Sequence, residues 1–106
     1  MTRPVRIFIA GPMTGLPDYN LPAFAAAADQ LRAAGYEAVN PGHRGVIEGY
    51  TWSDYLRDSL RELLTCDAVA VLDGWYDSRG ARLENHVADQ LGMRIKYVDV
   101  WLKEAA

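Results

Sequence analysis

Glu84 is the residue whose type and position most directly suggest chemistry. It lies on the apolar stripe of a predicted helix, together with Val87, Ala88 and Leu91. A carboxylate on such a stripe must either lose its hydration or face a cavity. We therefore expect Glu84 to point into a crevice and to act as a nucleophile or base. The alternative is a place at the border of the stripe, where Glu84 reaches solvent near the positive end of the helix.

Two glycine-bearing segments could hold a ligand beside Glu84. Ser78 and Gly80 open the same helix, where free backbone amides favour an anion; the simpler interpretation is an N-cap serine followed by a turn glycine. The other segment, residues 11–15, follows the first predicted strand. It is neither a Walker A loop nor a G-x-G-x-x-G fingerprint, which disfavours an NTPase or a dinucleotide enzyme. Its candidate contacts to a phosphate or sugar are Gly11, Met13, Thr14 and Gly15.

Asp73 and Trp75 follow a continuously apolar strand, at the kind of edge where α/β folds place functional residues. We expect Trp75 to stack on a flat ligand such as a nucleobase. Trp52 begins the apolar stripe of another helix, which favours a place in the core. Asp73 could be catalytic, or it could start a turn with Gly74.

The cysteine and histidines do not indicate a metal site, a disulfide or a hydrolytic triad. There are one cysteine and two histidines, far apart in the sequence. His43 and His86 have no evident serine or cysteine partner, so both are expected at the surface. Cys66 is expected to be buried and inert. We therefore expect neither a metal nor a cofactor.

The composition describes one small globular domain. The chain has 106 residues, half of them hydrophobic, which suffices for a single domain spanning 1–106 and is too short for two. A net charge of −3 with scattered lysines and arginines disfavours binding to long nucleic acids or to anionic membranes. Apolar runs are far shorter than the ~20 residues that cross a bilayer, and the first residues lack the layout of a signal peptide. We expect a cytoplasmic domain whose ligand is a small molecule.

Strands and helices alternate along the chain. Strands are predicted over residues 5–10, 36–40, 68–72 and 94–100, with a short polar tail after the last. Helices are predicted from Leu21 to before Gly35, with Asn20 as N-cap, from Thr51 onward, and from Ser78 to before Gly92. This order predicts an α/β three-layer sandwich, flavodoxin/Rossmann-like, whose parallel sheet of four to five strands has helices on both faces. The loops at residues 11–15, 40–50 and 73–80 should then share one edge.

The middle helix opens with a capping-box pattern at Thr51 and Asp54. Its spacing places Ser59 on the inward stripe with Leu60 and Leu63. Asp58 falls on the opposite, charged face, because one residue turns a helical side chain by roughly 100°.

The quoted motifs resemble those of a known group of proteins. They are I-F-I-A-G-P-M-T-G at 7–15, C-D at 66–67, G-W at 74–75 and S-R-G-A-R-L-E at 78–84. With them the chain resembles the nucleoside 2-deoxyribosyltransferase-like superfamily from about residue 5 to 98, and more closely a small branch found in bacteria and phages. S-x-G-x-x-x-E is also similar to the pattern of the deoxynucleoside 5′-monophosphate N-glycosidases.

The resemblance implies that Glu84 attacks C1′ of a ribosyl or 2-deoxyribosyl group and expels the base, and that water or a second base then takes the sugar. It also implies that Ser78 contacts a 5′-phosphate and that the protein is a homodimer. Two positions depart from the family: Phe8 stands where a tyrosine is common, and Ser59 where an aspartate is. Asp73 or Asp77 could substitute for that carboxylate. The alternatives are a catalytically degraded module that binds or senses nucleotides, and a purely structural assembly subunit.

Overall fold

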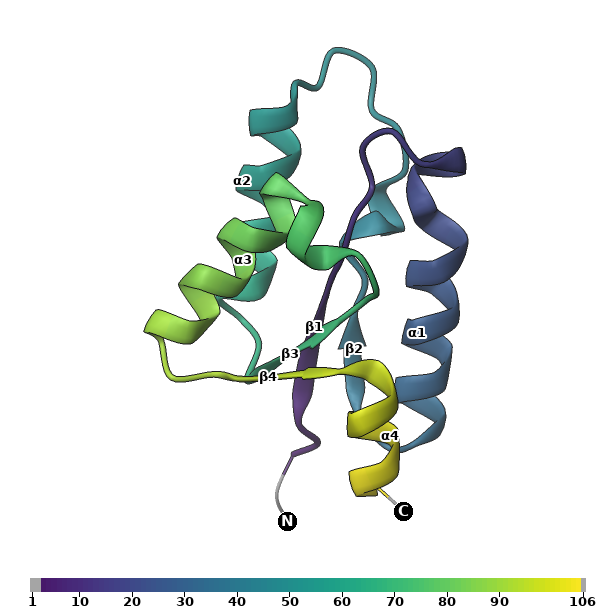
Figure 1. The fold of residues 1–106 in the computed structure, drawn as a ribbon, viewed down its shortest axis with the longest axis vertical. Helices are drawn as coiled ribbons and strands as arrows, with labels where there is room; N and C mark the ends of the chain where they lie inside the picture. Colours follow the sequence, from purple (N-terminus) through teal and green to yellow (C-terminus); the bar gives the residue numbers. More distant parts are fainter. Residues whose placement is uncertain (1–2, 106) are drawn as a thin grey trace.

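The chain forms one all-parallel sheet of four strands, in the order β2-β1-β3-β4 (Figure 1). The computed structural model describes residues 3–105. The strands are β1 (Arg6–Ala10), β2 (Glu37–Val39), β3 (Ala68–Val71) and β4 (Arg94–Tyr97). The helices are α1 (Leu21–Ala33), α2 (Trp52–Leu63), α3 (Arg79–Gln90) and α4 (Val98–Ala105), with short 3-10 turns η1 (Pro17–Asn20), η2 (Pro41–Arg44) and η3 (Trp75–Asp77).

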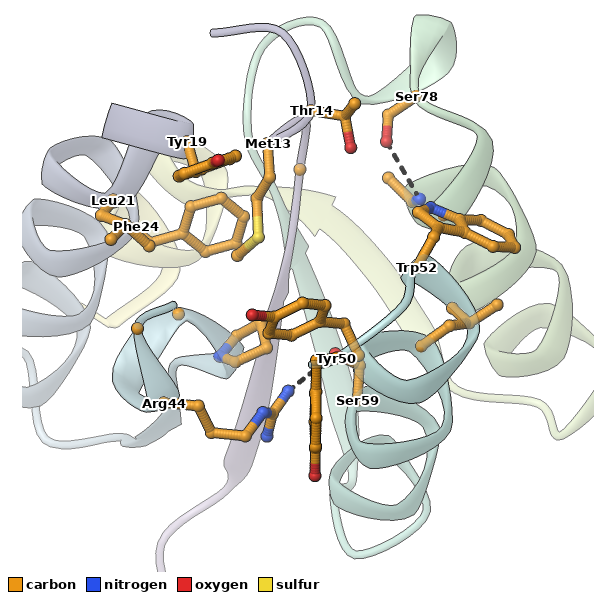
Figure 2. Close-up of a pocket in the computed structure, with 18 of the residues that line it drawn as sticks. Met13, Thr14, Tyr19, Leu21, Phe24, Arg44, Tyr50, Trp52, Ser59 and Ser78 are labelled. Atoms are coloured by element: carbon orange, nitrogen blue, oxygen red, sulfur yellow. Dashed lines mark hydrogen bonds between the residues drawn. The ribbon is translucent and has the colours of Figure 1, made fainter. Parts of the chain in front are cut away.

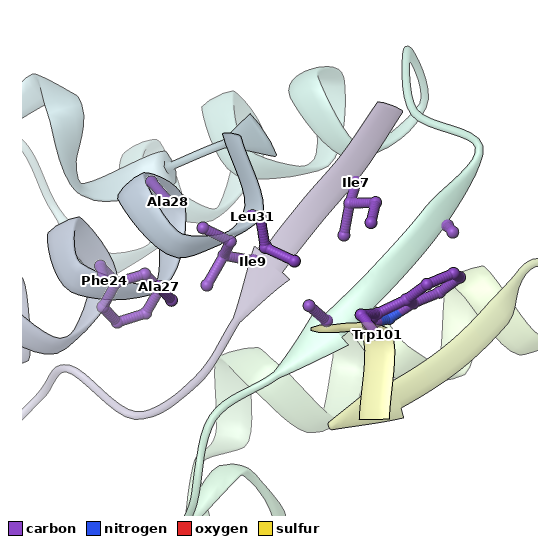
Figure 3. Close-up of a cluster of buried hydrophobic side chains, with 9 residues drawn as sticks. Ile7, Ile9, Phe24, Ala27, Ala28, Leu31 and Trp101 are labelled. Carbon is purple, nitrogen blue, oxygen red and sulfur yellow. The ribbon is translucent and has the colours of Figure 1, made fainter. Parts of the chain in front are cut away.

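Alternate residues of the central strands face opposite helix layers. Ile7 and Ile9 of β1 pack against α1 and α4, in a cluster that includes Leu31 and Trp101 (Figure 3). Phe8 and Ala10 of the same strand face the other way, into a cluster that includes Leu63 of α2 and Ala88 of α3. Because successive side chains of a strand point to opposite faces, one apolar strand serves both cores. The predicted three-layer α/β sandwich is confirmed.

The C-terminal residues form a helix where the sequence analysis expected a longer strand and a polar tail. β4 ends at Tyr97, and α4 begins at the next residue. Trp101 of α4 is buried, and its indole N–H donates to the Val69 carbonyl over 2.9 Å. Its backbone carbonyl accepts a 3.0 Å bond from the Tyr36 hydroxyl. α4 thus covers apolar sheet surface beside α1, and the predicted extent of the last strand was wrong.

α1 begins where the sequence predicts it, at Leu21. Asn20 occupies the N-cap position, but its side chain makes no capping hydrogen bond. Its amide instead donates to the Pro12 carbonyl over 2.9 Å. Asn20 therefore ties the start of α1 to the loop that follows β1.

Strand order reverses between β1 and β3, the two central strands. Loops from both strands leave at the same edge of the sheet, where ligands bind in open α/β folds. Gly11 lies at this point, and a Cβ there would be 2.8 Å from the Leu72 Cβ. Glycine lets the two loops pass closely. Within residues 3–105, no helix is long and apolar enough to cross a membrane.

Candidate active site

A cavity of about 300 Å³ opens at this edge of the sheet (Figure 2). This volume is at the lower end of the range for small-molecule sites. Its wall comes from the loop after β1, the start of α1, the segment from η2 to residue 50, the inner face of α2 and the first turns of α3. The lining residues on which the site depends are Met13, Thr14, Tyr19, Arg44, Tyr50, Trp52, Tyr55, Ser59, Ser78 and Glu84.

Glu84 lies in this wall with only 7% of its surface exposed. Burial raises the pKa of its carboxyl from 4.5 to about 8, and the charge of Arg44 acts in the opposite direction. Among residues 3–105, no side-chain hydrogen bond or ion pair to the carboxylate is found. A buried carboxylate without a partner is destabilising, and such groups cluster at sites of chemistry.

Ser78 and Glu84 both lie in the cavity wall at the start of α3, with Ser78 as the N-cap residue of that helix. The Ser78 hydroxyl oxygen caps the helix by accepting from the Ala81 amide over 3.2 Å (Figure 2). The hydroxyl proton stays available to a ligand, because a serine both donates and accepts. Trp52 of α2 lies beside Gly80, and the Arg79 guanidinium stacks 4.1 Å from the centre of its ring. One end of the cavity thus combines a helix N-terminus with a hydroxyl, while Arg79 is exposed and is not part of the cavity lining.

Arg44 brings a positive charge to the wall formed by η2 and α2. Its guanidinium donates to the Ser59 hydroxyl over 3.0 Å and pairs with Glu62. Asn40 caps η2 by accepting from the Gly42 amide over 2.8 Å, which fixes the turn that carries Arg44. Arg44 was not among the predicted site residues, since a short turn has no periodic pattern. Its place in the loop at 40–50 was the available signal.

α2 also holds the loop at 45–50 against the cavity. The Tyr55 hydroxyl accepts from the Ile47 amide over 2.7 Å, and the Tyr50 hydroxyl donates to Asp58 over 2.8 Å. This bond to Asp58 raises the pKa of the Tyr50 phenol. Asp58 is half-buried between Tyr50 and Arg44. The expectation that it lies on an open, charged face of the helix was therefore wrong. The loop at 45–50 folds over that face of the helix.

The structure brings most of the predicted site residues together. Seven line the cavity: Gly11, Met13, Thr14, Ser59, Ser78, Gly80 and Glu84. Four others do not: Phe8, Gly15, Asp73 and Trp75. Phe8 is fully buried in the sheet core.

Asp73 and Trp75 belong to a turn outside the cavity. Asp73 is exposed, and the Trp75 amide donates to the Leu72 carbonyl over 3.2 Å around Gly74, which has a left-handed φ of 83°. The Trp75 indole N–H donates to the Tyr97 hydroxyl over 3.2 Å. Trp52, expected in the core, is an exposed residue of the cavity wall. Trp52 thus lines the cavity, where Trp75 was expected, and Trp75 packs against the core, where Trp52 was expected.

The cysteine and histidines lie as expected. Cys66 is buried, and burial raises the pKa of its thiol. His43 and His86 are exposed, and the His43 Nε2 atom lies 3.0 Å from the Glu62 Oε2 atom. Throughout the described part of the chain, no group of three or more histidine, cysteine, aspartate or glutamate side chains is placed to hold a metal ion.

Comparison with known proteins places the chain in one family. No curated protein matches it. The model of a domain of unknown function, DUF4406, matches residues 5–97. This match spans all four strands and the whole cavity wall, from the loop after β1 to Glu84. The chain belongs to the DUF4406 family.

Proposed function

We propose that this protein cleaves the N-glycosidic bond of a nucleoside or nucleoside 5′-monophosphate, with Glu84 as the nucleophile. One observation carries the proposal: a buried carboxylate without a described partner lies in the wall of a ligand-sized cavity. The resemblance to the nucleoside 2-deoxyribosyltransferase-like superfamily assigns the same role to the same residue. The proposal thus rests on a physical argument and on an independent resemblance.

The chemistry has two steps. A Glu84 carboxylate oxygen forms a bond to C1′ as the C1′–N bond breaks, and the base leaves with the bonding electron pair. The base takes a proton from water, since Glu84 is the sole carboxylate lining this cavity within residues 3–105. Water then attacks C1′ as the bond between C1′ and the Glu84 oxygen breaks, and its proton neutralises the hydroxide left by the first step. The free sugar or sugar phosphate is released and the carboxylate is restored. If a second base attacks in place of water, the same intermediate gives transfer.

The rest of the wall fits the other parts of such a substrate. Thr14 and Ser78 face one another at one end of the cavity (Figure 2), beside the free amides of the α3 N-terminus. Hydroxyls and amides in this position favour a 5′-phosphate. Aromatic side chains elsewhere in the wall favour a flat base.

The test is release of free base, followed by chromatography, from a panel of ribo- and deoxyribonucleosides and their 5′-monophosphates. The wild type should release base from at least one of them. Glu84→Gln, which keeps size and removes the nucleophile, should release it at least about a hundredfold more slowly. Glu37→Gln is the matched control, because Glu37 begins β2 at the opposite edge of the sheet and is exposed.

Equal release by the wild type and Glu84→Gln would remove Glu84 from the mechanism. A second function is favoured by one observation. Two positions that hold a tyrosine and an aspartate in the nucleoside 2-deoxyribosyltransferase-like superfamily hold Phe8, buried in the core, and Ser59, bonded to Arg44. If nucleotides raise the melting temperature without release of base, the protein is a nucleotide-binding module that has lost its activity.

A further inference from the structure

Three consecutive residues before α1 have left-handed backbone conformations. Asp18, Tyr19 and Asn20 have φ values of 51°, 52° and 61°. Left-handed conformations are unfavourable for L-residues, although aspartate and asparagine tolerate them better than most. Tyr19 is the exceptional member of this segment, because a bulky aromatic residue gains nothing from this backbone.

The surrounding chain holds the strained segment in place. The side-chain amide of Asn20 donates to the Pro12 carbonyl over 2.9 Å, and the backbone amide of Tyr19 donates to the Leu16 carbonyl over 3.0 Å. Strained backbone persists where its surroundings enforce it, and it is concentrated at ligand-binding positions. A glycine at 19 would satisfy the backbone but would remove the ring. The backbone conformation therefore does not explain why residue 19 is a tyrosine.

That side chain lies in the cavity wall. Tyr19 lies beside Met13, Leu21 and Phe24 in Figure 2, and 52% of its surface is exposed. Within residues 3–105, no hydrogen bond to its hydroxyl is found. Its ring is accessible and polar contacts do not hold it.

The other aromatic residues of the wall make contacts with neighbouring side chains. Phe24 is buried in the α1 core. Tyr50 and Tyr55 pack edge to face with ring centres 4.9 Å apart, and their hydroxyls bind Asp58 and Ile47. One face of Trp52 is covered by Arg79. Trp75, the base contact expected from the sequence, lies outside the cavity.

We propose that Tyr19 is the ring on which the planar base of the ligand stacks, which makes it a specificity-determining residue of this site. The inference rests on the proposed function for the class of ligand, a nucleobase joined to a sugar phosphate. It does not depend on turnover, since stacking contributes to binding before any bond breaks.

The experiment compares Tyr19→Leu with Tyr19→Phe by calorimetric titration, both in the Glu84→Gln background so that no nucleotide is consumed. Both variants place a bulky side chain on the same strained backbone, and only phenylalanine keeps a ring. The probes are the 5′-monophosphates of adenosine, guanosine, cytidine and thymidine, with ribose 5-phosphate as the probe that lacks a base. Tyr76→Leu removes an exposed ring outside the cavity and is the matched control.

Tyr19→Leu should bind its best nucleotide about tenfold more weakly, because it loses the stacking of the base on an aromatic ring. Its affinity for ribose 5-phosphate should not change, and Tyr19→Phe and Tyr76→Leu should bind as the parent does. Equal nucleotide affinity in all variants, or no nucleotide binding by the parent, would overturn the inference. If the wild type releases base but Tyr19→Leu binds nucleotides normally, the stacking role of Tyr19 is refuted and the proposed catalysis stands. If Tyr19→Leu binds nucleotides more weakly but the wild type releases no base, the catalysis is refuted and the stacking role stands.

Discussion

The two edges of the sheet hold carboxylates in opposite situations. Asp67 precedes β3, where both of its oxygens accept 2.7 Å bonds from the Arg3 guanidinium and one also accepts from the Arg6 amide over 2.9 Å. The bonds from Arg3 and from the Arg6 amide lower the pKa of Asp67 to about 2. Glu84 lies at the other edge, where burial raises its pKa to about 8.

The two carboxylates differ in their effect on stability: Asp67 stabilises the fold, whereas the burial of Glu84 is unfavourable when it is ionised. Asp67 joins the N-terminal segment to the start of β3 and is stabilised by its partners. Glu84 is placed by the first turns of α3 against the cavity, and the described part of the chain offers it one opposing charge, Arg44. A protein retains such a group where function requires it.

The largest expected effect is on the pH dependence of base release. A nucleophilic carboxylate must be ionised, so the rate should rise about tenfold per pH unit below the pKa of Glu84 and level off above about pH 8. The measurement is the initial rate of base release between pH 5 and 9 at a substrate concentration well below KM, where the rate reports the ionisation of the free protein. A rate that falls on passing from pH 5 to 8 would mean that the neutral acid is the active form, and Glu84 would then be a proton donor.

The next effect is on stability. The folded pKa of Glu84 is above its unfolded value, so the native state binds more protons than the unfolded state between about pH 4.5 and 8. Its contribution to stability is thus greatest below pH 4.5 and is lost as pH rises through 8. Glu84→Gln should therefore gain stability over the wild type by a few kcal/mol at pH 9 and by little at pH 5, since one pKa unit is about 1.4 kcal/mol.

Urea unfolding of the wild type and Glu84→Gln at both pH values measures this difference. Glu37→Gln again serves as the matched control, because it removes an exposed glutamate far from the cavity. A difference between wild type and Glu84→Gln that stays constant from pH 5 to 9 would show that the buried carboxyl does not titrate on folding.

The sequence predicted the fold well because its signals are local. The β-branched, apolar run at 7–9 and the alanine- and valine-rich run at 68–71 formed the central strands, and the helical stripes ending at Leu31 and Leu63 packed on them. α4 escaped prediction because its contact with the core comes from a short stripe of three residues, Val98, Trp101 and Leu102. Trp101 has no apolar periodicity around it that is long enough to distinguish a helix from a strand.

The candidate site was predicted less evenly. Glu84 could be located because an acid interrupts an apolar stripe, which is visible in the sequence. Arg44 and Tyr19 lie on a 3-10 turn and a left-handed turn, and such segments carry no periodic signal. The places of Trp52 and Trp75 depend on contacts remote in sequence, since Trp52 packs beside Arg79 and Trp75 donates a hydrogen bond to Tyr97.

The smallest expected effect is at Asp67, and it should have the opposite sign to that at Glu84. The folded pKa of Asp67 lies below its ordinary value of 3.8, so its contribution to stability is present above about pH 4 and is lost as pH falls through 2. Asp67→Asn should therefore destabilise the protein at pH 7. The loss should be about 1 kcal/mol or less, because the pair with Arg3 is exposed to solvent and screened by salt. Urea unfolding at pH 7 in low salt and in 1 M NaCl measures it, and the loss should shrink in high salt. If Asp67→Asn and Glu84→Gln changed stability in the same direction at pH 9, the two carboxylates would not differ in the way that their surroundings indicate.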